Sequence, residues 1–164
     1  MSAIDDLLVN NAQFAASFDG TSAKVVPAKK VIVLTCMDSR LDPVRVLGLA
    51  PGDAHVLRNA GGIASEDAIR SIMLSQRRLG TTSIMVVHHT DCGMLSLHEQ
   101  REKDQIEADT GIRPSFALGA FTDLEADVRE TVARLVASPF LPCKDDIRGF
   151  VYEVDTGRLR EVAS

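Results

Sequence analysis

Two uninterrupted apolar, β-branched runs constrain the fold of this chain more than any other feature. One covers residues 31–35 (Val-Ile-Val-Leu-Thr), and the other is Ile-Met-Val-Val at residues 84–87, within a strand predicted at residues 83–89. A strand with one face in water alternates apolar and polar residues, whereas a strand covered on both faces is apolar throughout, as in parallel sheets. A further strand is predicted at residues 54–57, so the first, second and third predicted strands in chain order are residues 31–35, 54–57 and 83–89. We therefore expect an α/β fold, with a mainly parallel central β-sheet flanked by helices.

The segment between the second and third predicted strands has the pattern of the helix that connects parallel strands. Ser65 can cap its first turn, Glu66 and Asp67 suit the positive end of a helix dipole, and Gly80 can end it. Apolar residues recur along it at helical spacing: Ile69, Ile72, Met73 and Leu79. We predict a βαβ unit here.

The rest of the chain predicts three more helices and a hairpin. Residues 2–18 read as an amphipathic helix that packs on the body or on a partner subunit, closed by Asp19-Gly20 and followed by a connector to about residue 29. A polar helix is expected at residues 96–109, and a second begins at a capping box over residues 122–125 and ends before Pro139. Residues 149–162 predict a terminal hairpin. We expect a single domain over residues 1–164, of which 1–29 are the N-terminal helix and connector.

Composition narrows the functional class. A formal charge of −5 and a pI near 5.3 argue against a nucleic-acid surface, which needs clustered Lys and Arg. The apolar runs are too short to span a bilayer and the N-terminus has no basic leader, so we expect a cytoplasmic protein with no membrane partner. Three cysteines are an odd number, which favours metal binding or catalysis over a disulfide framework.

Two of these cysteines lie where parallel strands end. Cys36 directly follows the strand predicted at residues 31–35. The strand predicted at residues 83–89 ends in His89, and Cys92 comes three residues later. Sites in open parallel sheets form beyond the carboxyl ends of strands, so these residues can converge. Two thiolates and one imidazole suit zinc, and three protein ligands leave the open position of a catalytic site. Cys143 is a possible fourth ligand, but it lies far from both clusters and we interpret it as an ordinary free thiol.

Asp38 and Arg40 add a second pair of groups to this candidate site. A carboxylate two residues beyond a ligand can reach the open metal position, either to bind the metal or to accept a hydrogen bond from bound water. The planar fork of Arg40 can hold that carboxylate ionised and oriented. A surface salt bridge in a turn is the alternative, which the neighbouring ligand disfavours.

Three ordered motifs give this chain a family resemblance. Cys-x-Asp-x-Arg at residues 36–40, Arg-Asn-Ala-Gly at 58–61 and His-x-x-Cys-Gly at 89–93 resemble the β-class carbonic anhydrases, in particular their short microbial branch, from about residue 30 to 162. The resemblance implies zinc held by Cys36, His89 and Cys92, with Asp38 and Arg40 as a catalytic dyad. It also implies a homodimer or a multiple of dimers, in which the N-terminal helix embraces a second subunit and the active site lies near the interface.

The resemblance, read together with the residues, predicts reversible hydration of carbon dioxide to bicarbonate by a zinc-bound hydroxide. Two thiolates donate more charge than two imidazoles, so the working pH should lie above neutrality. His88 and His55 could relay the proton, but both fit a packed, structural histidine better, and His98 and Asp91 read as solvated.

Two other functions remain open at this point. The same zinc hydroxide could hydrolyse carbonyl sulfide or carbon disulfide, which are linear and electrophilic like carbon dioxide. Alternatively, the chain could be a structural or sensory zinc module in which Asp38 permanently occupies the fourth metal position. The open-site argument and Arg40 weigh against that module.

Overall fold

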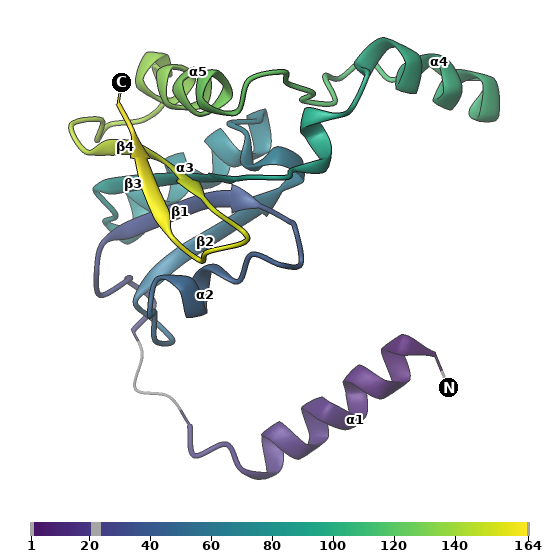
Figure 1. The fold of residues 1–164 in the computed structure, drawn as a ribbon. Coiled ribbons are helices and arrows are strands. Elements are labelled where there is room, and N and C mark those ends of the chain that lie inside the picture. Colours follow the sequence, from purple (N-terminus) through teal and green to yellow (C-terminus); the bar gives the residue numbers. More distant parts are fainter. Residues whose placement is uncertain (1, 21–23, 164) are drawn as a thin grey trace.

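A five-stranded sheet organises the computed structural model, which describes residues 2–20 and 24–163. The strand order is β2-β1-β3-β4-β5 (Figure 1). The first four strands are parallel, and β5 is antiparallel to β4. Their bounds are β1 Val31–Cys36, β2 Ala54–Asn59, β3 Ser83–His89, β4 Ile147–Tyr152 and β5 Leu159–Val162. The mainly parallel sheet is confirmed, and β2 is longer than its apolar run because it continues through Arg58 and Asn59.

Different elements cover the two faces of the sheet. Helices α3 (Glu66–Leu79) and α5 (Leu124–Ala137) pack on the face that carries Ile32 and Leu34. The opposite face, which carries Val33 and Val87, is covered by the short helix α2 (Pro43–Val46) and by apolar residues of the hairpin. Both faces of β1 and β3 are thus buried, which explains their continuous apolar runs.

Local signals placed some helix ends correctly and others wrongly. Ser65 caps α3 by accepting a hydrogen bond from the amide of Ala68, and Gly80 ends it with a φ of 69°. For α5 the predicted capping box begins one residue early, because Asp123 rather than Thr122 accepts the bond from a first-turn amide. The polar segment after β3 begins with a 3-10 turn, Gly93–Leu95, before α4 (Glu99–Thr110).

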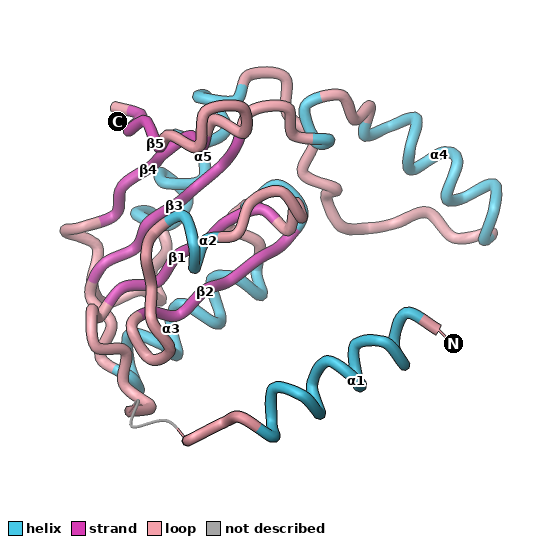
Figure 2. Tube along the Cα trace, turned by 60° about the horizontal axis from the view of Figure 1, so that its bottom comes forward, coloured by secondary structure: helices cyan, strands magenta, loops and turns pink. Residues whose placement is uncertain are grey.

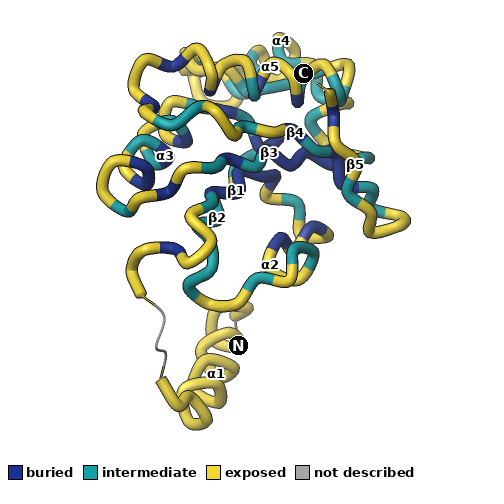
Figure 3. Tube along the Cα trace, turned by 90° about the vertical axis from the view of Figure 1, so that its left-hand side faces the viewer, coloured by how far each residue is buried: buried dark blue, intermediate teal, exposed yellow. Residues whose placement is uncertain are grey.

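Helices α1 (Ala3–Ala16) and α4 project from the body to the same side (Figures 1 and 2). Helix α1 ends at a cap on Ser17, ahead of the predicted stop at Asp19-Gly20. It has no buried residue, and its whole length is exposed in Figure 3. Within the described ranges, no helix has both the length and the apolar character that crossing a bilayer requires.

Register and one glycine position the carboxyl end of β1. Strands β1 and β3 pair in parallel with Thr35 opposite Val87, so both end at the same edge of the sheet. The turn Ala60–Gly62 lies against that end. At Gly62, with φ of 74°, a Cβ atom would be only 2.9 Å from the backbone nitrogen of Cys36. Glycine is required there both by the left-handed backbone and by the close approach.

Candidate metal centre

The two strand ends bring one histidine and two cysteines into a single buried cluster. The ligand atoms of Cys36, His89 and Cys92 all lie within 4.8 Å of one another. Cys36 ends β1, His89 ends β3, and Cys92 follows after a turn in which Asp91 has a φ of 54°. This left-handed residue bends the chain sharply enough for two side chains three positions apart to point to one place. Cys143 does not belong to the cluster.

The orientation of His89 suits a metal ligand. Its Nδ1 atom lies 2.8 Å from the carbonyl oxygen of Thr90, which can only accept a hydrogen bond, so we place the ring proton on Nδ1. The Nε2 atom therefore carries the lone pair, and it is buried without a hydrogen-bond partner among the described residues. Thr90 is itself fixed, because its amide and its hydroxyl bond to the backbone of Tyr152 and Val154. An orphaned imidazole nitrogen facing two thiols fits a zinc ion.

The two thiols affect each other's ionisation. The pKa of Cys36 is lowered, first by a hydrogen bond from the Cys92 thiol and further by His89 and by nearby backbone amides, although burial opposes this. The pKa of Cys92 is raised for the matching reason, because its proton is held by Cys36 and its charged form would lie beside another thiolate in a buried place. A cation at this cluster would favour both thiolates.

Asp38 and Arg40 form the predicted pair beside the cluster. Arg40 donates from Nε to Asp38 Oδ1 (3.0 Å) and from Nη2 to Asp38 Oδ2 (2.8 Å), a two-pronged contact. These bonds, and that from the Arg40 amide, hold the pKa of the Asp38 carboxyl well below its usual range. Asp38 Oδ2 lies 3.7 Å from His89 Nε2, so the ionised carboxylate borders the ligand cluster.

Asp91 is a site residue that the sequence interpretation missed. We read it as solvated, and its side chain is indeed 78% exposed, yet its Oδ2 atom lies 2.6 Å from Nη1 of Arg40. Its carbonyl oxygen accepts a second bond, 2.9 Å long, from Nη2 of Arg40. The position of Asp91 between two candidate ligands was the only signal available, because the partners lie far apart in the chain.

The Arg-Asn-Ala-Gly motif at residues 58–61 holds the backbone of the loop after β1 and of the turn after β2. Arg58 donates from Nε to the carbonyl oxygen of Cys36 (3.0 Å) and from Nη2 to that of Asp38 (2.6 Å). Asn59 exchanges two hydrogen bonds with the backbone of Ile63, which closes the turn that contains Gly62. The motif therefore fixes backbone around the cluster.

The other three histidines lie as the sequence predicted: His88 and His55 are packed within the protein, and His98 is in contact with solvent. His88 is 1% exposed and lies between Asp127, 3.0 Å from its Nδ1, and the carbonyl oxygen of Gly62, 3.2 Å from its Nε2. His55 bonds to the buried hydroxyl of Ser75 at 2.6 Å. His98 is exposed.

With this geometry in place, known proteins show the family. A family model described as carbonic anhydrase matches residues 31–159. β-Carbonic anhydrase 1 of Mycobacterium tuberculosis is 44% identical over 162 residues, which is 99% of this chain and 99% of that protein. The chain belongs to the β-carbonic anhydrase family. It is thus an enzyme of a family whose reaction is the hydration of carbon dioxide, as its three motifs predicted.

Solved structures agree with this membership. A carbonic anhydrase from Streptococcus mutans superposes with a TM-score of 0.93 at 41% identity and covers 99% of both chains. A second group of relatives carries another name: a carbon disulfide hydrolase of Acidithiobacillus thiooxidans is 37% identical over 80% of this chain and 76% of that protein. The Mycobacterium tuberculosis carbonic anhydrase is more similar to this chain than that hydrolase is, in both identity and coverage.

Proposed function

We propose that this chain catalyses the reversible hydration of carbon dioxide to bicarbonate with a zinc ion held by Cys36, His89 and Cys92. The observation that carries this proposal is the buried cluster of two thiols and an imidazole, whose Nε2 has no hydrogen-bond partner among the described residues. A zinc ion bound there acidifies water and so supplies hydroxide near neutral pH. Three protein ligands leave a position open for that water.

Asp38 and Arg40 orient the reacting groups in this proposal. Asp38 borders the cluster and is ionised, so it can only accept a hydrogen bond. By accepting the remaining proton of the nucleophile, its carboxylate turns a lone pair toward the carbon of the substrate. Arg40 binds both oxygen atoms of that carboxylate and keeps it from turning onto the metal. Orientation of this kind lowers the barrier because the geometry is set before the substrate arrives.

Stopped-flow hydration of carbon dioxide, on protein with measured zinc content, tests the proposal. We expect one zinc per subunit and a hydration rate that still rises above pH 7, because two thiolates weaken the acidification of water. A rate that stays flat down to acidic pH would contradict the role of the thiolates. One zinc per subunit with no turnover at any pH would instead support a structural or sensory zinc module.

Hydrolysis of carbon disulfide is a second candidate, favoured by the relatives of that name at 35–38% identity. The attack of hydroxide on a linear, electrophilic carbon is common to both reactions. Release of hydrogen sulfide from carbon disulfide, measured beside carbon dioxide hydration on the same preparation, separates the two. We expect carbon dioxide to be the better substrate, and faster sulfide release would reverse the assignment.

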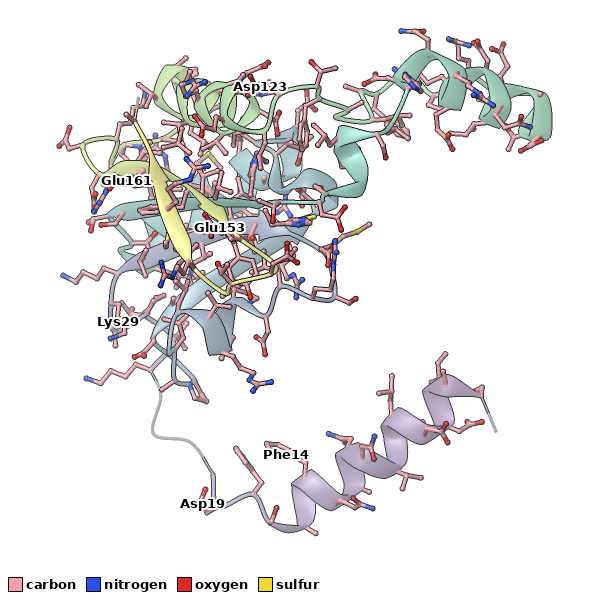
Figure 4. All side chains as sticks on the ribbon, viewed as in Figure 1. Phe14, Asp19, Lys29, Asp123, Glu153 and Glu161 are labelled. Carbon is pink, nitrogen blue, oxygen red and sulfur yellow. The ribbon has the colours of Figure 1, made fainter. Side chains whose placement is uncertain are left out.

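We also propose that two copies of the chain associate through α1, and that residues 1–164 form a single zinc domain in which 1–29 are the N-terminal helix and connector. Apolar side chains on one side of α1, and one just after it, are largely exposed in the described structure: Ile4, Leu7, Leu8, Phe14 and Phe18 are each more than half exposed. The ring of Phe14, labelled in Figure 4, lies beside that of Phe18, with 5.4 Å between the ring centroids. A second copy of this chain would bury that side.

Substitutions on opposite sides of α1 test the association. Leu7→Glu places a charge on the apolar side and is expected to convert dimers to monomers in size-exclusion chromatography with light scattering. Val9→Glu is the matched control: Val9 is also apolar and 52% exposed, but it lies on the other side of the helix. A monomeric parent protein, or equal effects of both substitutions, would refute pairing through this side of α1.

A further inference from the structure

Arg40 is held from two directions by groups on different segments of the chain. On one side it binds both carboxylate oxygens of Asp38. On the other side, Nη1 binds the carboxylate of Asp91 and Nη2 binds the carbonyl oxygen of the same residue. Four of the side-chain N–H groups of the guanidinium, whose donors form a rigid fork, are therefore engaged.

The two anchors of Arg40 constrain different things. Asp38 and Arg40 lie two residues apart in one loop, whose backbone Arg58 holds, so their mutual contact fixes the two side chains to each other. It does not tie the side chain of Arg40 to the segment after β3. Asp91 lies in the turn between His89 and Cys92, and its left-handed backbone directs both its carboxylate and its carbonyl to Arg40. The contact with Asp91 therefore ties the Asp38-Arg40 pair to the segment that carries two of the three candidate ligands.

The effect of this contact is on geometry more than on stability. An exposed ion pair contributes little to folding stability, so Asp91 adds little as a surface charge. Ordering a long arginine side chain has a clear consequence for Asp38, however, because Asp38 takes its orientation from Arg40. Freed from Asp91, the pair can adopt positions in which the carboxylate no longer borders the cluster correctly.

We propose that Asp91 is a positioning residue for catalysis: it fixes Arg40, and through Arg40 it fixes Asp38, relative to the Cys36-His89-Cys92 cluster. This inference rests on the proposed hydration of carbon dioxide. Asp91 binds Arg40, and in this proposal its role is to hold the Asp38-Arg40 pair in place beside the metal ligands.

Asp91→Asn is the primary test, because asparagine keeps the shape and tolerates the left-handed backbone but has no charge. On the zinc-loaded enzyme we expect kcat to fall by about tenfold, as for other groups that orient the surroundings of a metal. KM and zinc content should stay near their original values. Asp91→Gly, which also fits a positive φ and lacks the side chain altogether, should cost at least as much.

Two controls separate positioning from general effects. Asp104→Asn breaks an ion pair of the same length, 2.6 Å to Arg113 on the projecting α4 region, and is expected to leave kcat unchanged. Combining Asp91→Asn with Arg40→Ala should cost no more than Arg40→Ala alone, because Asp91 acts through Arg40. Additive losses in the double variant would refute that route.

A readout independent of turnover completes the design. Hydrogen exchange of the Arg40 side-chain Nε–H, followed by NMR on the zinc-loaded protein, should be slow in the parent and at least several-fold faster in Asp91→Asn. Unchanged kcat together with unchanged exchange would overturn the inference, as would a loss of zinc that accounts for the lost activity. If the parent fails to hydrate carbon dioxide, the proposed function fails, while the exchange comparison still decides whether Asp91 orders Arg40.

Discussion

Cys92→Ser is expected to abolish zinc binding and to reduce carbon dioxide hydration by at least about 10³-fold, toward the uncatalysed rate. Serine nearly preserves the shape of the side chain, but its hydroxyl stays protonated and is a harder donor than thiolate, so it binds zinc poorly. Cys92 is buried in the cluster with Cys36 and His89, so its loss removes one of the three candidate ligands. Zinc per subunit and stopped-flow rates measure both losses.

Cys143→Ser provides the matched control. Cys143 is half-buried and lies outside the cluster. Its carbonyl oxygen accepts a hydrogen bond from Nε2 of Gln76, and its amide donates one to Oε1 of the same side chain. This substitution also replaces a side-chain sulfur by oxygen, but not at a candidate metal ligand. Zinc content and hydration rate should therefore remain at the parent level. Full zinc occupancy in Cys92→Ser would remove the cluster from the mechanism, and so would equal zinc loss in both variants. Circular dichroism of each variant checks that the fold is retained.

The strands that carry this site could be predicted from the sequence, because the burial of a strand and the position where it ends are both visible in its own residues. Runs that are apolar on both faces identified β1 and β3, and parallel pairing then required Cys36 and His89 to lie at one edge of the sheet. Convergence of Cys92 with them followed from its short separation from His89. The fold and the grouping of the candidate ligands were therefore accessible without coordinates.

Contacts between segments that lie far apart in the chain could not be predicted from a local sequence pattern. Asp91 and Arg40 lie 51 residues apart, and the residues around one do not indicate contact with the other. For this reason we predicted that Asp91 is solvated. Likewise, the motif at residues 58–61 could not reveal that Arg58 holds the carbonyl oxygens of the loop after β1. Such bonds depend on how loops at a sheet edge fold over one another, which hydrophobic periodicity does not encode.

Errors at helix ends have a related physical cause. Thr122 and Asp123 both have side chains that can accept a bond from a first-turn amide, so the sequence alone does not choose between them. Asp123 is the cap because the chain enters α5 from an extended residue at that position. One residue of difference does not alter the buried face of the helix, and the core prediction survives it.

Arg40→Ala gives the second large effect: zinc content should stay at the parent level while hydration falls by roughly 100-fold. The variant removes both bonds to the Asp38 carboxylate and the tie to Asp91 at once, so Asp38 loses its orientation and can turn onto the open metal position. Small anions such as azide, which compete for that position, should then bind more weakly. Stopped-flow rates, zinc analysis and azide inhibition constants measure these three outcomes.

The pH at which Arg40→Ala is assayed separates orientation from charge. Arg40 lowers the pKa of Asp38, so its removal lets that pKa rise toward the ordinary value of about 3.9. At pH 8 the carboxylate is ionised in both proteins, and a loss of rate there reports lost orientation. Arg40→Lys keeps the positive charge without the two-pronged fork and should recover only part of the rate. Full activity of Arg40→Ala at pH 8, with zinc bound, would exclude the Asp38-Arg40 pair from the mechanism.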